Sequence, residues 1–348
     1  MMIESIINKR DALRKLTDEE FEFVVPKLAS ELEAHGILYD TYTEEETKAD
    51  WHSLCKKPID KTKTTIAATS IVGMKIMRKY MHHFHEVKNY KNISVSTLWK
   101  KEHLEKALRF NRKNHSTPYA SEIIRSLSFT NGLGKVTMYR PLMARNVVAY
   151  FNANSVLDVC AGWGGRMLGT KSLGQHISYT GVEPCKKTFT GLTKICEELA
   201  IDNVTLVNKP AEEFLCELPE NNTFDLALTS PPYFNLELYS DEETQSTSQY
   251  KDYANWIEKF LEPVIKNIIS RVTYSCWSVK NFKTDKKYDL LTDVTRIHEE
   301  HGWKMMDVMF TMSNSRRPGC SNSKETVTVP KKTEEITYVF CKEESKNT

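Results

Sequence analysis

The stretch that decides the fold is SVLDVCAGWGGR, residues 155–166. It begins as a short, largely apolar segment with β-branched residues, which is typical of a buried strand. This segment runs into a turn that contains three glycines, and a helix is expected from Arg166 onward. Strand, glycine turn and helix in this order form the arrangement with which α/β proteins hold a cofactor. Gly162 and Gly164 let the backbone approach a ligand closely, and Gly165 lets the helix start tight against the sheet.

Two apolar segments downstream repeat the strand pattern. Residues 177–182 end in Glu183, about 25 residues after Asp158, which is near the spacing at which an acidic side chain takes the hydroxyls of a ribose. Residues 204–207 open onto a loop against whose backbone a nucleoside's adenine could lie. The cofactor-binding residues predicted at these three strand ends are Asp158, Ala161, Gly162, Gly164, Glu183, Ala211 and Glu212.

A further strand is expected at residues 224–228, and it is followed by the sequence TSPPY, residues 229–233. Open α/β sheets place their chemistry at the carboxyl ends of strands. The two prolines fix φ and remove two N–H donors, so the carbonyls of Ser230 and Pro231 are held as rigid acceptors beside a hydroxyl and an aromatic ring. A planar amine can donate to these acceptors while its ring stacks on Tyr233. Taken alone, the motif is equally compatible with an ordinary Pro-Pro turn.

Together these motifs, over residues 136–342, resemble the S-adenosylmethionine-dependent methyltransferases that modify exocyclic amines of nucleobases. Residues 138–144 look like the segment that lies over the methionine part of the cofactor in that family. The resemblance therefore adds Tyr139, Pro141 and Thr229 to the predicted S-adenosylmethionine site. Residues 234–240 resemble the matching stretch of phage, plasmid and large-virus members.

The same resemblance identifies the catalytic motif as Ser230, Pro231, Pro232 and Tyr233. Its first position is Ser, which in this family favours N4 of cytosine, whereas Asp or Asn favours N6 of adenine. The implied reaction methylates a flipped-out base of double-stranded DNA without a metal or a covalent intermediate. Members of the family can work beside a cognate restriction nuclease, so this is the further partner that the resemblance implies.

The rest of the chain completes a sheet. Helical spacing between residues 250 and 272, and between 288 and 301, alternates with strand patterns at 273–279, 303–311 and 335–341. The last two strands have no helix between them, so one strand is expected to be antiparallel. These patterns, with the resemblance, predict an α/β, Rossmann-like class I methyltransferase fold: seven strands, mostly parallel, one antiparallel edge strand, and helices on both faces. Residues 1–134 are predicted to form a mainly helical domain for DNA recognition, and residues 135–348 the catalytic domain.

Composition excludes several classes of protein. The 348 residues are 40% hydrophobic, and no apolar run is long enough to span a membrane. The polar N-terminus does not resemble a secretory signal. The eight cysteines are dispersed without ligand spacing, which favours a reducing compartment and argues against a metal. We therefore expect a cytoplasmic or, in a viral setting, nucleic-acid-associated protein that is not secreted.

Charge is unevenly distributed although the net charge is only +2. Residues 1–50 carry about twice as many acids as bases, whereas residues 75–145 carry about fifteen bases and four acids. A basic, aromatic-rich face suits phosphate contacts, although a solvated helix surface would show the same pattern. A second basic segment spans residues 313–332. The nucleic-acid-binding residues predicted from both segments are Lys100, Lys101, Arg109, Arg112, Lys113, Arg316 and Arg317.

Several functions stay open at this point. The motifs favour methylation of an exocyclic DNA amine, and the same chemistry would serve RNA or a protein amine. Pro184-Cys185 is the dipeptide that cytosine-C5 methyltransferases use as nucleophile, but it lies beside the expected ribose acid. A catalytically silent nucleic-acid platform would also keep this fold.

Overall fold

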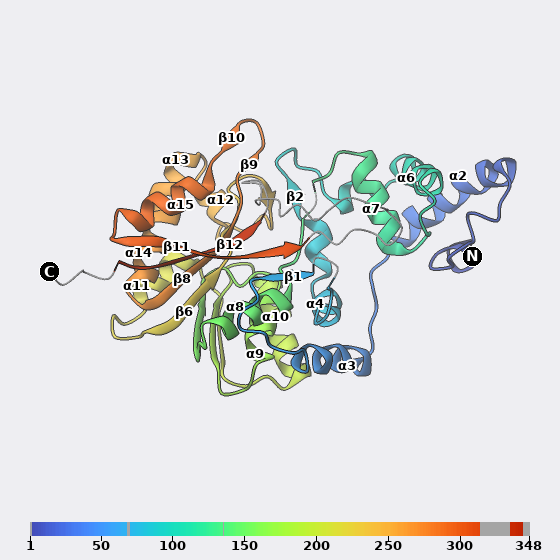
Figure 1. Cartoon of the computed structure of the whole chain (residues 1–348). Coiled ribbons are helices and arrows are strands. Elements are labelled where there is room, and N and C mark those ends of the chain that lie inside the picture. Colours follow the sequence, from blue (N-terminus) through green and yellow to red (C-terminus); the bar gives the residue numbers. More distant parts are fainter. Residues whose placement is uncertain (1, 68–69, 135, 314–334, 344–348) are drawn as a thin grey trace, which may run out of the picture. The chain divides into compact units, whose positions relative to one another are not determined.

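The computed structural model describes residues 2–67, 70–134, 136–313 and 335–343 (Figure 1). Contacts divide the chain into two compact units. We call them the helical unit, which comprises Met1–Thr41, His82–Thr137 and Glu237–Ser240, and the sheet unit, which comprises Tyr42–Met81, Met138–Leu236 and Asp241–Thr348. This division differs from a single boundary after residue 134, because residues 42–81 pack with the sheet unit and residues 237–240 with the helical unit.

An eight-stranded sheet forms the centre of the sheet unit, in the order β1-β11-β12-β8-β6-β3-β4-β5. The strands are β1 (Thr65–Ala67), β3 (Ser155–Asp158), β4 (Ser178–Val182), β5 (Val204–Val207), β6 (Phe224–Thr229), β8 (Val272–Val279), β11 (Trp303–Ser313) and β12 (Ile336–Lys342). Only β12 among them is antiparallel to its neighbours. The mostly parallel, Rossmann-like α/β fold is therefore confirmed.

Two details of the sheet differ from the expectation. The antiparallel strand is not at the edge, because β12 pairs with β8 on one side and with β11 on the other. The strand count is eight rather than seven, because β1 pairs in parallel with β11. A three-residue strand is too short to give a periodic pattern, so the sequence offered no signal for β1.

Helices cover both faces of the sheet (Figure 1). The chain runs from β3 through β4 to β5 in one direction along the sheet, and from β6 to β8 in the other. Since crossovers between parallel strands are right-handed, the connecting helices of the two halves lie on opposite faces. One group contains α8 (Pro141–Tyr150), α9 (Gly165–Lys171) and α10 (Lys186–Leu199), and the other contains α11 (Ala211–Glu217), α14 (Glu262–Ile269) and α15 (Leu290–Glu299).

Shorter elements complete the sheet unit around the predicted catalytic loop, residues 229–233. A helical segment precedes α14 and consists of α12 (Ser246–Gln249), α13 (Tyr253–Trp256) and the π-helical turn η2 (Ile257–Leu261). After β8 the chain forms a small hairpin from β9 (Phe282–Lys283) and β10 (Lys287–Tyr288). The aromatic side chains of α13, η2 and this hairpin belong to the same buried cluster as β6 and α14.

The helical unit has its own apolar core. Its elements are α1 (Met2–Ile6), α2 (Asp18–His35), η1 (His82–Glu86), β2 (Lys88–Asn89), α5 (Val95–Leu98), α6 (Lys101–Lys113), α7 (Ala120–Thr130) and β7 (Glu237–Leu238). Leu28 and Leu32 of α2 pack with Leu104 of α6 and Ile123 of α7, all fully buried. Within the described part of the chain, no helix is long and apolar enough to cross a bilayer.

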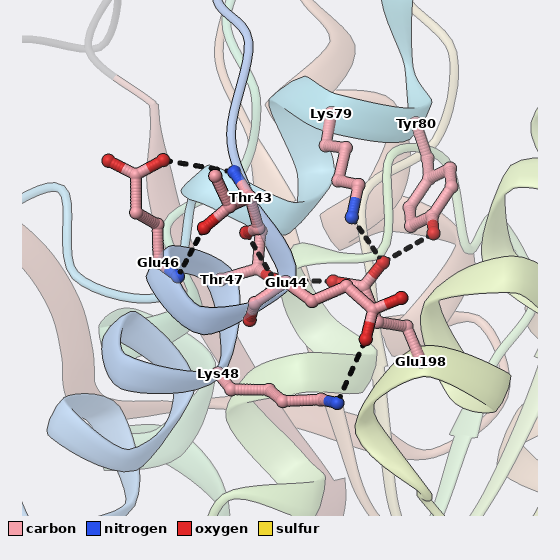
Figure 2. A network of polar contacts seen from close by, with 8 residues as sticks. All are labelled: Thr43, Glu44, Glu46, Thr47, Lys48, Lys79, Tyr80 and Glu198. Carbon is pink, nitrogen blue, oxygen red and sulfur yellow. Dashed lines mark hydrogen bonds and ion pairs between the residues drawn. The ribbon is translucent and has the colours of Figure 1, made fainter.

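A polar network attaches residues 42–81 to the sheet unit (Figure 2). Glu198 of α10 accepts hydrogen bonds from Thr47 of α3 (Glu44–Cys55) and from Lys79 and Tyr80 of α4 (Lys75–Tyr80). The Glu198 side chain is only 4% exposed. Burial alone would raise the pKa of this carboxyl, but the Lys79 ammonium and the two hydroxyls together lower it.

Glu198→Gln is expected to destabilise the protein by about 1.5–3 kcal/mol at neutral pH, since hydrogen bonds to a charged group are removed. The folded-state pKa lies below the ordinary value of 4.5, so this stabilisation is present above that pH and is lost as the pH falls through the folded pKa. Denaturant unfolding at pH 7 and near pH 4 should show a large difference from wild type that shrinks in acid. Glu197→Gln, one residue away and exposed, is the control, and an equal loss there would contradict the assignment.

Candidate active site

The predicted cofactor and catalytic loops leave the same edge of the sheet. Asp158 ends β3, Val182 ends β4 and Thr229 ends β6, and these three parallel strands are adjacent in the order β6-β3-β4. The order in which the chain adds strands to the sheet reverses between β3 and β6, so this is the topological switch point of the sheet. Ligands of open α/β sheets bind outside the carboxyl ends of the strands at this point.

The glycine turn has the backbone geometry that its sequence predicts. Gly162 has φ +53° and Gly164 has φ +87°, a left-handed region that other residues rarely adopt. Gly164 is also the residue that precedes the first turn of α9. The Ala161 N–H donates to the Val182 carbonyl at 2.8 Å, which holds the turn against the end of β4.

Gly165 differs from its expected role. A Cβ atom at this position would lie 2.1 Å from the Tyr139 carbonyl oxygen, so the missing side chain makes room for the segment before α8 and not for the sheet. Four residues on, a Cβ at Gly169 would lie 2.3 Å from the Pro141 carbonyl oxygen. Two glycines one helical turn apart therefore let α8 pack closely on α9, and they place Tyr139 and Pro141 beside the glycine turn.

Asp158 is fully buried, and its carboxylate is engaged within the protein. It accepts from Arg166 Nε at 2.8 Å, from the Tyr179 hydroxyl at 2.7 Å and from the Cys160 N–H at 3.3 Å. The Arg166 guanidinium also donates to the Cys160 carbonyl. Asp158 thus holds the turn in shape, and the sequence reasoning missed its partners Arg166 and Tyr179.

Glu183 joins the end of β4 to the glycine turn. One carboxylate oxygen accepts from the Gly162 N–H at 2.9 Å and the other from the Cys185 N–H at 2.9 Å. Burial raises the pKa of Glu183 to about 7, although the two backbone hydrogen bonds favour the charged form. Each oxygen keeps lone pairs for further donors.

Ser230 begins a chain of hydroxyl groups. Its hydroxyl donates to the Ser278 carbonyl at 3.0 Å, so Ser230 Oγ is left with acceptor capacity only. Ser278 Oγ lies 2.6 Å from Thr337 Oγ1, which lies 3.3 Å from the Tyr139 hydroxyl. Burial raises the pKa of Tyr139 to about 12, so the phenol stays neutral.

This chain ends at the glycine turn, because the guanidinium carbon of Arg166 lies 5.1 Å from the centroid of the Tyr139 ring. A series of contacts, through both the carbonyl and the hydroxyl of Ser278 and through the Tyr139 ring, therefore connects the predicted catalytic loop with the residues that shape the glycine turn. Ser278 and Thr337 face each other across β8 and β12. No short motif contains them, and only the strand register shows that they meet.

Aromatic side chains pack against the predicted catalytic loop. Tyr233 is 5% exposed; its ring packs against Phe282 in a T-shaped arrangement with 5.8 Å between the ring centroids, and the Lys280 ammonium lies 5.1 Å from the centroid of the Tyr233 ring. Phe234 has φ +43°, a left-handed conformation that costs a non-glycine residue energy and is found at functional sites. A base that stacks on Tyr233 would share the ring with Lys280.

The remaining predicted cofactor residues lie at the ends of β5 and β6. Ala211, at the start of α11, and Thr229 are buried. Glu212 accepts from the Tyr250 hydroxyl at 3.2 Å through Oε1, and burial raises its pKa. Its second oxygen, Oε2, is buried without a hydrogen-bond partner in the described residues, so it is an available acceptor.

Cys185 is not poised as a nucleophile. Burial raises the pKa of its thiol, and Sγ lies 3.6 Å from a carboxylate oxygen of Glu242. A reactive thiolate needs a lowered pKa and electropositive neighbours. Among the residues described, no group of three or more His, Cys, Asp or Glu side chains could hold a metal ion.

The predicted nucleic-acid contacts in the helical unit are largely engaged with acidic residues of α2. Arg109 bonds to Glu22 at 2.9 Å and to Glu105 of its own helix at 3.1 Å. Lys100 lies 3.4 Å from Glu33, and the Lys101 backbone N–H also donates to Glu33, at 3.0 Å. Lys113 is exposed. Arg316 and Arg317 lie outside the described residues.

Arg112 is the most strongly held of these bases. It lies 2.8 Å from Asp18, donates to the carbonyls of Leu16 and Thr17, and covers the Phe21 ring at 4.3 Å. Phosphate binding by Arg109 or Arg112 would require exchange of these partners. The two oppositely charged stretches of sequence are thus in part complementary faces of one helix pair.

Arg112→Ala should destabilise the helical unit by about 1–3 kcal/mol, because two hydrogen bonds to carbonyls and a cation–π interaction are removed. Lys113→Ala, on the next residue, should change stability by less than about 0.5 kcal/mol. Denaturant unfolding of both variants checks the difference. Equal stabilities would contradict a structural role for Arg112.

No family model and no curated protein sequence matches this chain. Among solved structures, an rRNA methylase from Streptococcus thermophilus is 11% identical and matches over 60% of this chain and 99% of its own, with a TM-score of 0.37. An S-adenosylmethionine-dependent methyltransferase from Agrobacterium tumefaciens is 11% identical over 58% and 60%, with a TM-score of 0.37. Magnesium protoporphyrin IX methyltransferase from Synechocystis PCC 6803, solved with bound S-adenosylmethionine, is 10% identical over 58% and 79%, with a TM-score of 0.35.

Proposed function

We propose that this chain is an S-adenosylmethionine-dependent methyltransferase that methylates the exocyclic amine of a DNA base, with N4 of cytosine favoured. The observation that carries the proposal is the convergence of the glycine turn, Glu183 and the Ser230–Tyr233 loop at adjacent strand ends of the switch point. The series of contacts from Ser230 to Tyr139 and Arg166 supports it, because it couples the two halves of such a site.

The residues present fit this cofactor. Glu183 has lone pairs for two ribose hydroxyls, and the buried Oε2 of Glu212 would accept from the adenine amine. Gly162 and Gly164 have left-handed backbone conformations and no side chains, so the ligand could approach the backbone closely at both positions. When bound, S-adenosylmethionine would supply an electrophilic methyl group on its sulfonium. Roles in cofactor binding at Tyr139, Pro141, Asp158, Ala161, Ala211 and Thr229 belong to the same proposal.

The catalytic loop prepares the amine. The Ser230 hydroxyl donates its hydrogen bond to the Ser278 carbonyl, so Ser230 Oγ can only accept a hydrogen bond from a ligand. Ser230 Oγ and the Pro231 carbonyl would each accept a hydrogen bond from an NH2 group, which makes the nitrogen lone pair available for attack. Pro232 keeps the loop rigid, and Tyr233 packs on the base. Positioning and fixed dipoles would account for most of the rate enhancement. The methylated amine is acidic enough to lose its proton to water.

The base and the polymer that would be methylated are the two finer parts of this proposal. Serine at position 230 favours N4 of cytosine; N6 of adenine, and an amine in RNA or protein, are the alternatives. For the DNA surface, Lys101, Lys113 and residues 316–317 are the first candidates, and Lys100, Arg109 and Arg112 would contribute after exchanging their carboxylate partners. Mass spectrometry of nucleosides from DNA and RNA of expressing cells separates N4-methylcytosine, N6-methyladenine and 5-methylcytosine. Detection of none of them in either polymer, with cofactor bound, would move the proposal to a protein substrate.

Ser230→Ala removes one of two amine acceptors and should lower the methyl-transfer rate constant about 10²- to 10³-fold, the scale for losing one such hydrogen bond in a transition state. Cofactor affinity should change little, because the removed interaction strengthens only during transfer. Single-turnover methylation and calorimetry measure the two quantities. Tyr233→Ala should also slow methylation by removing about 1–3 kcal/mol of stacking.

Ser270→Ala, at the exposed end of α14, is the matched control and should keep the wild-type rate. Wild-type rates in both loop variants would mean that residues 230–233 are not the catalytic loop, and the proposal would then fail.

The affinity for S-adenosylmethionine should rise with pH through Glu183. Because burial raises the folded pKa to about 7 from 4.5, the contribution of Glu183 to stability without ligand falls as the pH rises between these values. The ionised carboxylate is the better acceptor for ribose hydroxyls, so this group should strengthen binding up to about tenfold between pH 6 and pH 8. Calorimetry of wild type and Glu183→Gln isolates the effect, since Gln keeps the shape without titrating. Parallel pH profiles in the two proteins would rule it out.

A further inference from the structure

We infer that the hairpin of β9 and β10, beside the catalytic loop, binds the phosphodiester backbone of the nucleic-acid substrate through Lys283, Lys286 and Lys287. The inference rests on the proposed function and names the surface that would hold the strand next to the reacting base. None of these lysines is among the residues that sequence reasoning selected for nucleic-acid contact.

The hairpin has two distinct faces. Phe282 pairs with Tyr288 and Lys283 with Lys287, and the Thr284 N–H donates to the Lys286 carbonyl at 3.0 Å across the turn. The side chains of Phe282, Thr284 and Tyr288 are buried, whereas Lys283, Lys286 and Lys287 are all exposed. The apolar face is thus used for attachment, and the three lysines lie on the exposed face, where the Lys286 ammonium is 5.4 Å from the centroid of the Tyr288 ring.

That attachment is to the catalytic loop itself. The Phe282 ring packs against Tyr233 at 5.8 Å, and Tyr288 packs against Phe234 at 5.8 Å. Thr284 Oγ1 lies 3.1 Å from Asn235 Oδ1, and Phe282 and Tyr288 stack on each other at 4.9 Å. Contacts to three consecutive residues of the loop fix the hairpin relative to any base held by Ser230 and Tyr233.

Among the described residues, the lysines of the hairpin are not paired with carboxylates, whereas the arginines of α6 are. Within the described chain, no carboxylate forms an ion pair with Lys283, Lys286 or Lys287. The carboxylate of the hairpin, on Asp285, accepts from the Thr284 and Tyr288 hydroxyls, which lower its pKa. Arg109 and Arg112 must give up carboxylate partners before they bind phosphate, whereas these lysines need not.

A phosphodiester strand fits this surface better than an acidic peptide does. The loop that anchors the hairpin presents acceptors and an aromatic ring suited to a base, and each nucleotide carries its phosphate at a regular spacing of about 3.4 Å per residue of a helical strand. Phosphates that flank the target base are therefore the anions that a substrate would bring to the hairpin. DNA and RNA share this chemistry.

The test compares binding of fluorescein-labelled 30-nucleotide DNA and RNA of one sequence, single- and double-stranded, by anisotropy over a range of salt. The variants change Lys283, Lys286 and Lys287 together to Gln, which removes the charges, or to Glu, which reverses them. The control changes Lys56, Lys57 and Lys194, three exposed lysines near α3 and on α10, to Glu. Calorimetry with S-adenosylmethionine and thermal melting verify that each variant is folded.

We expect the Glu variant to bind the preferred polymer at least about tenfold more weakly at low salt, with the Gln variant in between. The slope of log affinity against log salt should fall by about 2 to 3 units, since each phosphate that is no longer neutralised lowers it by about 0.9 on duplex DNA and by about 0.7 on a single strand. The control should behave as wild type. The polymer that shows the larger decrease in affinity, DNA or RNA, identifies the source of the phosphodiester.

Unchanged affinity and slope in both hairpin variants would overturn the inference, and so would an equal decrease in the control. Methylation of DNA by wild type separates this result from the proposed function. If wild type methylates DNA and the hairpin variants bind normally, the function stands and the hairpin assignment fails. If binding depends on the hairpin but no methylated nucleoside forms, the hairpin assignment stands and the proposed reaction fails.

Discussion

The buried pair of Asp158 and Arg166 is the interaction on which the rest of the site depends. Both side chains are almost fully removed from water, so each charge needs the other, and removal of one partner from such a pair costs about 3–5 kcal/mol. The pair closes the glycine turn, because Arg166 also donates to the carbonyl of Cys160 within the turn. With the turn closed, the Gly162 N–H can donate to Glu183. The Arg166 guanidinium also packs against the Tyr139 ring, and the Tyr139 hydroxyl lies near Thr337 Oγ1. From Thr337 the contacts lead to Ser278 and Ser230.

The sequence was sufficient for those parts of the fold that depend on neighbouring residues. Strand, glycine turn and helix from 155 to 166, the acid after the next strand, and the loop after residue 228 all follow from local pattern, and the structure places them at one sheet edge. The order of the strands within the sheet could not be predicted from local sequence pattern. The lack of a helical pattern between the strand patterns at 303–311 and 335–341 predicted an antiparallel strand, but insertion of β12 between β8 and β11 depends on pairings between distant segments.

Two residues of the candidate site were not predicted, for the same physical reason. Ser278 and Thr337 are 59 residues apart and meet only because β8 and β12 pair in that register. Charged residues show the same limitation. Bases clustered in the sequence suggested a binding face, but Arg109 and Arg112 form ion pairs with acidic residues of α2 that are 87 and 94 residues away in the chain. A surface potential is set by which charges remain unpaired after packing, and local composition does not contain this information.

The same series of contacts also explains why a neutral hydroxyl suits position 230. A carboxylate there would add a negative charge close to Ser278, Thr337 and Tyr139, all of which are neutral hydroxyl groups, and the Tyr139 phenol is kept neutral by burial. The one buried cation in this series, Arg166, is already matched by Asp158. Burial of an unpaired charge costs far more than burial of a hydroxyl that has a hydrogen-bond acceptor. Serine, whose hydroxyl donates to the Ser278 carbonyl, would supply an acceptor for the proposed amine without that cost. In the proposed reaction, a neutral acceptor would stabilise a developing positive charge on the nitrogen less than a carboxylate would, so alignment of the amine by the Pro231-Pro232 loop would have to contribute more of the rate enhancement.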